Sequence, residues 1–272
     1  MVVLGPIFDI PLMVCVGAAA TCWVLNVATK ECSWVDRLWS VLPPVYAWLF
    51  AWLGGWQPRS VLMALLATAW GVRLTYNFAR KGGYARGGED YRWEALRKLM
   101  PPWAFQVFNL LFIAMYQNAL IFAFTLPAYF IASRPTTALN VVDALGAVLF
   151  LAALAGETIA DQQQWNFHQE KKSLIAQGLS PKEPFLTAGM FRYSRHPNFF
   201  FEQAQWWVFT LFAIAAGLPW LNWTLAGTVF LTMLFDGSSR FTEYLTLRKY
   251  PSYRDYQKRV SRMIPWFANS KG

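Results

Sequence analysis

The chain alternates between long apolar segments and short polar linkers. Seven apolar segments come close to the roughly 20 residues that one membrane crossing needs. They are residues 8–29, 38–54, 59–79, 104–132, 139–160, 199–217 and 220–236. The pattern predicts an all-α, polytopic membrane protein with seven transmembrane helices, forming a single membrane domain over residues 1–272. Pro43 and Pro44 predict a bend or break in the second segment, and the length of segment 104–132 predicts a tilted helix.

Basic residues concentrate in alternate linkers. Residues 80–98, 161–196 and the C-terminal tail are rich in Lys and Arg, whereas the connections 55–58, 133–138 and 217–219 contain one basic residue, Arg134. The positive-inside rule then places the N-terminus outside and the C-terminus in the cytoplasm. The N-terminus has no basic leader region, so residues 8–29 are expected to be a retained span. We therefore expect a multi-pass protein of the cell membrane, the inner membrane if the source is bacterial.

Composition supports the membrane class and excludes others. Charged residues make up 14% of the chain, against about 25% in soluble domains. The net charge of +9 does not indicate nucleic-acid binding, because the basic residues lie in the linkers and tail, where anionic headgroups account for them. Cys15, Cys22 and Cys32 form no CxxC pair, so we expect neither a disulfide framework nor a metal site.

The most polar stretch next to an apolar segment is residues 189–202, GMFRYSRHPNFFFE. Pro197 disfavours the α conformation at His196 and suits the first position of a helix, so we expect a helix to start near Asn198. Exposed backbone N–H groups at that start, together with Arg192 and Arg195, are suited to binding an anion. The alternative is that these arginines only anchor the topology.

Other ionisable residues lie at the ends of apolar segments, where burial is costly and a functional role is expected. Asp36 and Arg37 open the second segment, and they could instead be a solvated loop pair. Helical spacing puts Arg73, Tyr76 and Asn77 on one face, although Arg73 could simply extend to the interface. Glu157 and Asp161, four residues apart, end the fifth segment, and could pair with basic loop residues.

The loop after the third segment, GGYARGGEDYRWEALRK, has neither the Walker pattern nor GxGxxG in a βαβ setting. HExxH and GxSxG are also absent from the chain. A nucleotide would therefore have to be held by helix ends and arginines, beside an apolar substrate.

In the tail we expect a helix that begins near Ser238 and ends or kinks at Pro251; an amphipathic surface helix is the alternative reading.

Four ordered motifs resemble the membrane steroid 5α-reductase-like family over roughly residues 33–267. GMFRYSRHPNFFFE is similar to its GxxRYSRHPNYxGE signature, and VDRLWS to its D-x-x-W element. WGVRL followed by GGEDYRW resembles its third span and cytosolic loop, and RKYPSYRDYQKRVSRMIPW its C-terminal signature. The resemblance implies a reductase that uses NADPH to reduce a carbon–carbon double bond conjugated to a ketone, most readily in a 3-oxosteroid. It implies no nucleic-acid partner, and we expect a monomer.

The resemblance also implies roles for individual residues. The cofactor candidates lie mainly in residues 73–98 and 157–267. They are Asn77, Arg80, Lys81, Arg86, Glu89, Asp90, Tyr91, Asp161, Arg192, Arg195, His196, Asn198, Glu202, Arg240, Glu243, Tyr244 and Lys249.

The substrate side differs from the family pattern. Val35-Asp36 stands where the animal enzymes place Gln-Glu, and Trp70 where they place Tyr. We expect Asp36 to bind the ketone as a protonated acid, with Tyr76 or Tyr91 as a second donor. Trp39 and Trp70 are the other substrate candidates.

Two other functions remain open on sequence grounds. An isoprenylcysteine carboxyl methyltransferase-like enzyme shares an RHPxYxG-like element and a basic tail but uses S-adenosylmethionine, which has no phosphate. A non-enzymatic sterol or lipid binder would not need the polar clusters at the segment ends. The dense basic linkers favour a phosphorylated cofactor.

Overall fold

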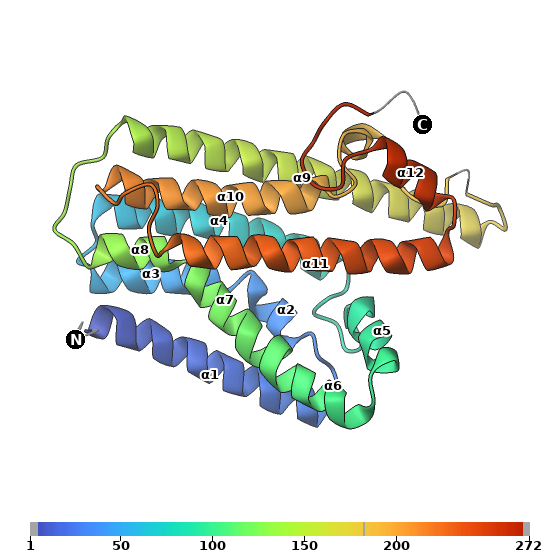
Figure 1. The fold of residues 1–272 in the computed structure, drawn as a ribbon, viewed down its shortest axis with the longest axis horizontal. Coiled ribbons are helices and arrows are strands. Elements are labelled where there is room, and N and C mark those ends of the chain that lie inside the picture. The colour runs from blue at the N-terminus through green and yellow to red at the C-terminus, as the bar shows by residue number, and fades with distance from the viewer. Residues whose placement is uncertain (1–4, 182, 269–272) are drawn as a thin grey trace. The chain divides into compact units, whose positions relative to one another are not determined.

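The computed structural model describes residues 5–181 and 183–268, and over these residues the secondary structure is helical, without strands (Figure 1). The all-α prediction is confirmed. The elements are α1 (Pro6–Thr29), α2 (Trp34–Trp39), α3 (Leu42–Leu53), α4 (Pro58–Arg80), α5 (Tyr91–Leu99), α6 (Pro102–Phe108), the π-helix η1 (Asn109–Tyr116), α7 (Gln117–Phe124), α8 (Leu126–Ala132), α9 (Val141–Ala176), the 3-10 turn η2 (Gly189–Arg192), α10 (Pro197–Ala215), α11 (Leu225–Lys249) and α12 (Tyr253–Arg259).

The chain divides into two compact units. Unit 1 comprises residues up to 148 together with 207–231, and unit 2 comprises residues 149–206 together with 232 onward. The helices α9, α10 and α11 each contribute residues to both units. Each unit is described by itself below, and the prediction of one continuous membrane domain stays a prediction.

Four helices in the described ranges are long and apolar enough to cross a membrane. They are α1, α4, the continuous Pro102–Phe124 rod and α9. This is consistent with a multi-pass membrane protein. At 1.5 Å per residue, the 36 residues of α9 extend about 54 Å, well beyond a hydrocarbon core of about 30 Å. The expected segment 139–160 is therefore the first part of a longer helix.

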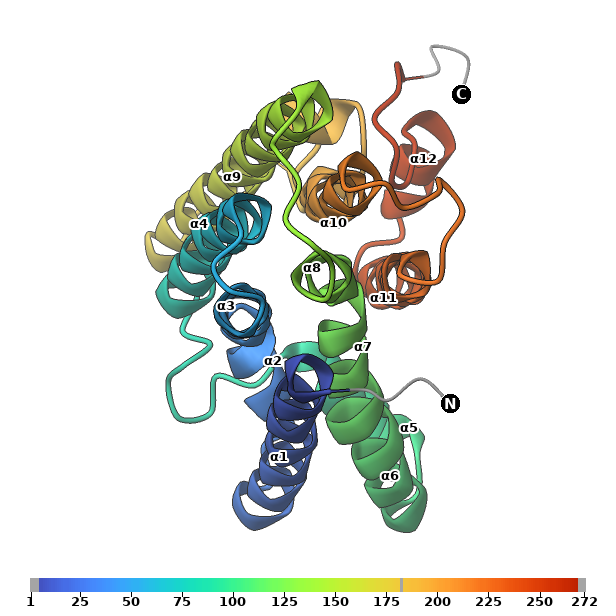
Figure 2. The same cartoon turned by 90° about the vertical axis from the view of Figure 1, so that its left-hand side faces the viewer.

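In unit 1, α3 packs along α4 (Figure 2). The expected break in segment 38–54 is present, but it falls at Ser40 and Val41, before the prolines. Pro43 and Pro44 occupy the first turn of α3, where a missing N–H breaks no helical hydrogen bond. Gly71 of α4 lies against the Ser40 carbonyl, and a Cβ there would come within 2.5 Å of that oxygen. The backbone at Ser40, between α2 and α3, is thus held closely to α4.

The expected tilted helix over 104–132 is interrupted instead. α6, η1 and α7 form a continuous rod, and the chain turns at Thr125 before α8. The eight-residue η1 is long for a π-helix, a form that is rare and often found at functional sites. It packs with α7 against α1, where the buried side-chain amides of Asn26 and Asn109 are hydrogen-bonded at 2.7 Å.

Unit 2 joins parts of α9, α10 and α11 to α12 and the C-terminal segment. α10 begins at Pro197, which confirms the predicted helix start. α11 begins at Leu225, inside the predicted segment 220–236, and continues without a break into the tail helix expected from near Ser238; it ends just before Pro251 as expected. The C-terminal segment lies along the turn that precedes α10. The backbone N–H groups of Arg195 and His196 donate to the carbonyls of Ser261 and Arg262, at 2.9 and 3.1 Å.

Candidate functional site

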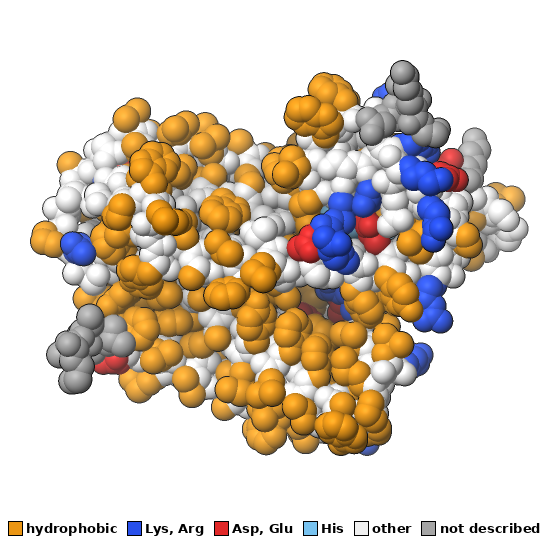
Figure 3. Space-filling view, viewed as in Figure 1, with side chains coloured by type: hydrophobic (Ala, Val, Ile, Leu, Met, Phe, Trp, Pro, Cys, Tyr) orange, Lys and Arg blue, Asp and Glu red, His pale blue; other side chains and the backbone are white. Residues whose placement is uncertain are grey.

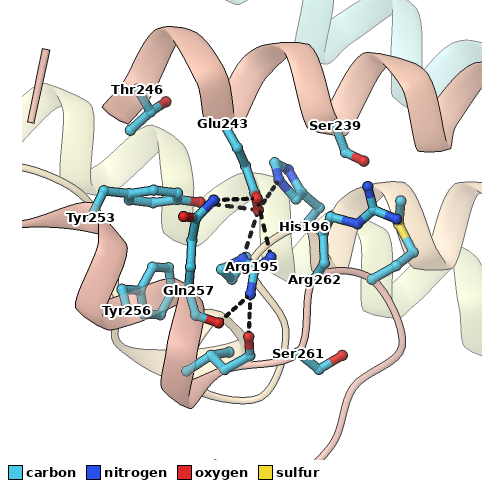
Figure 4. Close-up of polar contacts among 12 residues, drawn as sticks. Arg195, His196, Ser239, Glu243, Thr246, Tyr253, Tyr256, Gln257, Ser261 and Arg262 are labelled. Carbon is cyan, nitrogen blue, oxygen red and sulfur yellow. Dashed lines mark hydrogen bonds and ion pairs between the residues drawn. The ribbon is translucent and has the colours of Figure 1, made fainter. Parts of the chain in front are cut away.

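Glu243, on α11, is the centre of the polar cluster in unit 2 (Figure 4). Its carboxylate accepts two hydrogen bonds from the Arg195 guanidinium, at 2.6 and 3.1 Å. His196 Nε2 lies 3.1 Å from Oε1, and Gln257 Nε2 donates to Oε2 at 2.7 Å. Glu243 is 5% exposed. The cluster therefore ties the turn before α10 to α11 and α12 around one buried negative charge.

The Arg195 guanidinium donates hydrogen bonds to acceptors within the protein. Besides the paired bonds to Glu243, its Nη1 donates to the backbone carbonyls of Gln257 and Val260. Most of its donors thus face the C-terminal segment and α11. Arg195 was predicted to contact the cofactor, and this stays a prediction; the bonds present hold the turn before α10 in position.

The environment of Glu243 favours its charged form. Burial alone would raise the pKa of Glu243, but the hydrogen bonds from His196 and Arg195 and the charge of Arg195 together lower it to about 2. The carboxylate is ionised at neutral pH. Below it, Tyr253, Tyr256 and Val260 form a small buried core with Phe185 and Leu247.

The unit 2 portions of α9 and α10 carry the other acids predicted for the site. Asn198 Nδ2 donates to Asp161 Oδ1 at 3.3 Å, which brings two of the predicted cofactor residues together. Deeper along the same helices, Gln205 Nε2 donates to Glu157 Oε2 at 2.7 Å. Glu202 lies on α10 between these two pairs and is 7% exposed. The two helices therefore share a buried row of acids and amides.

The remaining predicted cofactor residues of unit 2 lie at its surface, where Lys and Arg side chains gather (Figure 3). Arg240 Nε donates to Asp236 Oδ2 at 2.7 Å. Tyr244 stacks on Phe241 and lies under the Arg248 guanidinium, and the Lys249 ammonium lies over the Tyr250 ring. Arg192 is exposed at the end of η2. These cations, unlike Arg195, are accessible to an anionic ligand.

Asp36 is the corresponding acid of unit 1. It is enclosed by protein yet retains some accessible surface. Trp93 Nε1 donates to its Oδ2 at 2.8 Å. Burial, and then the negative charge of Asp90, raise the pKa of Asp36 above its ordinary value. At a given pH, the protonated form of Asp36 is therefore more populated than that of an exposed aspartate.

Arg37 does not form the solvated pair with Asp36 that the sequence left open. It is buried, and it pairs with Glu31 at 2.8 Å and donates to the Gly83 carbonyl at 3.1 Å. Glu31 in turn accepts from the Gly87 N–H at 2.9 Å. Arg37 therefore fastens the loop after α4 onto the segment before α2.

The acids of the EDYRW loop also bond within unit 1. Glu89 pairs with Arg97 at 2.9 Å and accepts from the Cys32 N–H. Asp90 caps α5 by accepting from the Arg92 N–H and pairs with the Arg92 side chain at 2.6 Å. Both were predicted to contact the cofactor; the structure places them in contacts that order the loop.

The other unit 1 candidates lie on α4, in the loop after it and at the start of α5. Arg80 donates through Nε and Nη2 to Asn77 Oδ1, which brings these two together at the end of α4. Lys81 and Arg86 are exposed. Tyr76 and Tyr91 are 66% and 56% exposed, and Tyr76 packs under Arg80. Their exposure contrasts with the enclosed position of Asp36.

The two substrate tryptophans differ in burial. Trp70 is fully buried on α4, whereas Trp39 is half-buried on α2 and its ring lies 6.2 Å from that of Phe124.

Sequence reasoning missed several residues that build these clusters. No role was assigned to Trp93, Arg97, Tyr253 or Gln257, although each lies within a stretch quoted above. Trp93 lies three residues after Asp90, which caps α5. Over the described ranges, no group of three His, Cys, Asp or Glu side chains is placed to hold a metal ion.

Comparison with known proteins places the chain in a family. Residues 22–260 match the family described as "Protein of unknown function (DUF1295)". The chain belongs to this family. It is also 38% identical over 258 residues to "Uncharacterized protein C594.04c" of Schizosaccharomyces pombe, covering 89% of this chain and 75% of that protein. No solved structure matches the chain. The matched region includes Asp36, the EDYRW loop, the RYSRHPN turn and Glu243.

Proposed function

We propose that this protein is a membrane-embedded, NADPH-dependent reductase of the carbon–carbon double bond of an enone, with the Δ4 bond of a 3-oxosteroid as the preferred substrate. The observation that carries the proposal is Asp36. Its pKa is raised, Trp93 holds one of its oxygens, and the neighbouring Arg37 is engaged by Glu31. A neutral carboxyl group with accessible surface is the donor that an enone carbonyl requires.

In this proposal Asp36 acts on the ketone oxygen. Reduction at the β-carbon moves negative charge onto that oxygen, and a hydrogen bond from the Asp36 carboxyl stabilises it. The Trp93 N–H fixes the orientation of the carboxyl group. Tyr76 or Tyr91 serves as a second donor only if its exposed side chain turns toward the substrate. NADPH, when bound, supplies the hydride.

The polar residues of unit 2 fit a phosphorylated cofactor. The exposed cations Arg192, Arg240 and Lys249 offer charge-assisted hydrogen bonds to phosphate oxygens. Asn198 and Glu202, on the first turns of α10, offer an amide and a carboxylate to a nicotinamide group. Arg195, His196 and Glu243 hold the turn in place, so that these groups are presented together.

A thermal-shift measurement on the detergent-solubilised protein tests the proposal. NADPH should raise the melting temperature more than NADH, because the arginines can bind the additional 2′-phosphate. Asn198→Ala should reduce the NADPH shift, while Arg254→Ala, an exposed basic position on α12, should leave it unchanged. Equal shifts with the two nucleotides would contradict the cofactor assignment. Stabilisation by S-adenosylmethionine alone would favour the methyltransferase alternative.

The proposal includes seven crossings, with the N-terminus outside and the C-terminus in the cytoplasm. Beyond the four candidate spans, the 19 residues of α10 reach about 28 Å, close to one hydrocarbon thickness. Arg59 adds a positive charge beside the expected outer connections, but it is paired with buried Asp143 at 2.7 Å and does not alter the charge bias. A reporter inserted at 134–137 should be external, and one fused to the C-terminus cytoplasmic. The reverse would overturn the orientation.

A further inference from the structure

The C-terminal segment of unit 2 exposes a group of large apolar side chains. Ile264, Trp266 and Phe267 are 65%, 69% and 77% exposed, and Tyr193, on the turn before α10, is 42% exposed. The Tyr193 and Phe267 rings meet edge to face, with centroids 6.2 Å apart. We call these four residues the aromatic edge. Exposed apolar groups of this size mark interaction surfaces when they are gathered together.

The aromatic edge is held in place by the chain beneath it. The Trp266 N–H donates to the Tyr193 carbonyl at 2.9 Å, and Ser194 Oγ donates to the Met263 carbonyl at 2.7 Å. Ser261 Oγ bonds the Ile264 carbonyl. The segment is thus pinned to the turn on both sides of Pro265. The fixed backbone holds these apolar side chains outward. Exposing them to water is unfavourable, and burying them against another surface would remove that cost.

Positive charge borders the aromatic edge. Arg192 precedes Tyr193 and is exposed, as are Arg254, Lys258 and Arg259 on α12. The opposite face of α12 buries Tyr253 and Tyr256, so the charged face of this helix points outward. Asp255 is the one acid within α12. Figure 3 shows Lys and Arg side chains gathered over the C-terminal part of the chain.

We propose that the aromatic edge inserts into the headgroup region of a bilayer containing anionic lipids. Trp and Tyr favour the membrane interface, and Lys and Arg beside them are attracted to anionic headgroups. The position of Tyr193 fits a membrane interface, because the apolar helix α10 begins four residues later, at Pro197. This contact would fix the turn that carries Arg195 and His196 against the membrane surface. The inference rests on the multi-pass membrane character of the chain and is independent of the reductase proposal.

Site-specific fluorescence on the full-length protein in vesicles tests the inference. An environment-sensitive nitrobenzoxadiazole label is attached to the Phe267→Cys variant. The native cysteines Cys15, Cys22 and Cys32 are buried. Labelling of the unsubstituted protein measures the background. The matched control is Leu179→Cys. Leu179 is 53% exposed and lies just after the end of α9, a helix longer than one membrane span needs.

The label at 267 should emit at shorter wavelength than the label at 179, and doxyl-labelled lipids should quench it more strongly. The difference should grow when phosphatidylglycerol is added to phosphatidylcholine vesicles. Lys258→Glu with Arg259→Glu should remove that lipid dependence, since both positions are exposed and their reversal makes α12 acidic. Equal emission and quenching at the two positions would overturn the inference. A blue shift at 267 that increases with the protein-to-lipid ratio and is insensitive to doxyl lipids would also overturn the inference. That result would indicate that a second copy of the protein covers the aromatic edge.

Discussion

The acids Asp36 and Glu243 show how two polar environments in one chain shift the pKa of a carboxyl group in opposite directions. Asp36 receives a neutral indole N–H and lies near the negative Asp90, and its pKa is raised. Glu243 is also buried, but a bidentate arginine, a histidine and an amide lower its pKa to about 2. Burial raises the pKa of both acids, and only at Glu243 do the partners outweigh it. The comparison is consistent with the proposed role of Asp36 as a hydrogen-bond donor, and the bonds of Glu243 make it a structural anchor.

The largest effect expected from this comparison is on stability at Glu243. Glu243→Gln leaves Arg195 without an opposite charge at 9% side-chain exposure, which should cost about 3–5 kcal/mol of unfolding free energy. The measurement is a denaturation titration in mixed micelles. Glu94→Gln is the control, because Glu94 and Lys98 form an exposed pair whose loss should not be measurable. Equal responses of the two variants would show that the Glu243 cluster is not an anchor.

The second expected effect concerns catalysis at Asp36. Asp36→Ala should lower turnover of a 4-ene-3-ketosteroid by about 10²–10³-fold, the usual loss for one donor to an oxyanion. Asp36→Asn keeps an amide donor and should retain more activity than Asp36→Ala. NADPH affinity should change little in both. Single-turnover oxidation of NADPH with testosterone or progesterone measures these rates, and a wild-type rate in Asp36→Ala would remove Asp36 from the mechanism.

The two acids should also give stability profiles of opposite sign with pH. Glu243 has a folded-state pKa of about 2, below its ordinary 4.5, so its contribution is complete above about pH 4.5 and is lost as the pH falls toward 2. The pKa of Asp36 is raised from 3.8, so its effect on stability becomes less favourable as the pH rises above that value. Asp36→Asn should therefore gain stability relative to wild type between about pH 4 and neutral pH. A constant difference across that range would mean that Asp36 has an ordinary pKa.

The smallest expected effect is at Trp93, and it reports the charge of Asp36. Trp93→Phe removes the indole N–H from the buried side of the carboxyl group. The loss should be about 1 kcal/mol if Asp36 is neutral and about 2–3 kcal/mol if it is ionised. Trp206→Phe, at a fully buried position away from Asp36 in the sequence, controls for the loss of ring volume in the interior. The larger loss would contradict the assignment of Asp36 as a donor.

Local sequence signals predicted the helices better than the side-chain partners. Pro197 marked the start of α10 correctly, because its fixed φ and missing N–H act on the residues next to it. The apolar pattern gave the helical class, but it could not show the turn at Thr125 or the π-helix η1, since both depend on packing against α1 and α3. The segment 220–236 and the tail helix were predicted as separate elements, but they form one helix, α11, because the polar residues at 236–240 do not interrupt it.

Long-range pairs account for most of what the sequence missed at the candidate site. Arg195 looks like an anion ligand in its own motif, and only the fold shows that Glu243, 48 residues away, takes its charge. Arg37 stands next to Asp36 in the chain but pairs with Glu31. Adjacent opposite charges in a sequence therefore do not predict an ion pair, because successive residues on a helix point in different directions.

The bonds between Arg195 and the carbonyls of Gln257 and Val260 have a consequence for biosynthesis. The turn before α10 leaves the ribosome more than 60 residues before the chain that completes it. Until residues 257–262 are made, Arg195 has no access to those carbonyls, and His196 lacks the backbone acceptor on Arg262. The polar turn is therefore incomplete while α10 and α11 are synthesised. A premature stop shortly before residue 253 would leave every helix through α11 encoded but the turn without these acceptors.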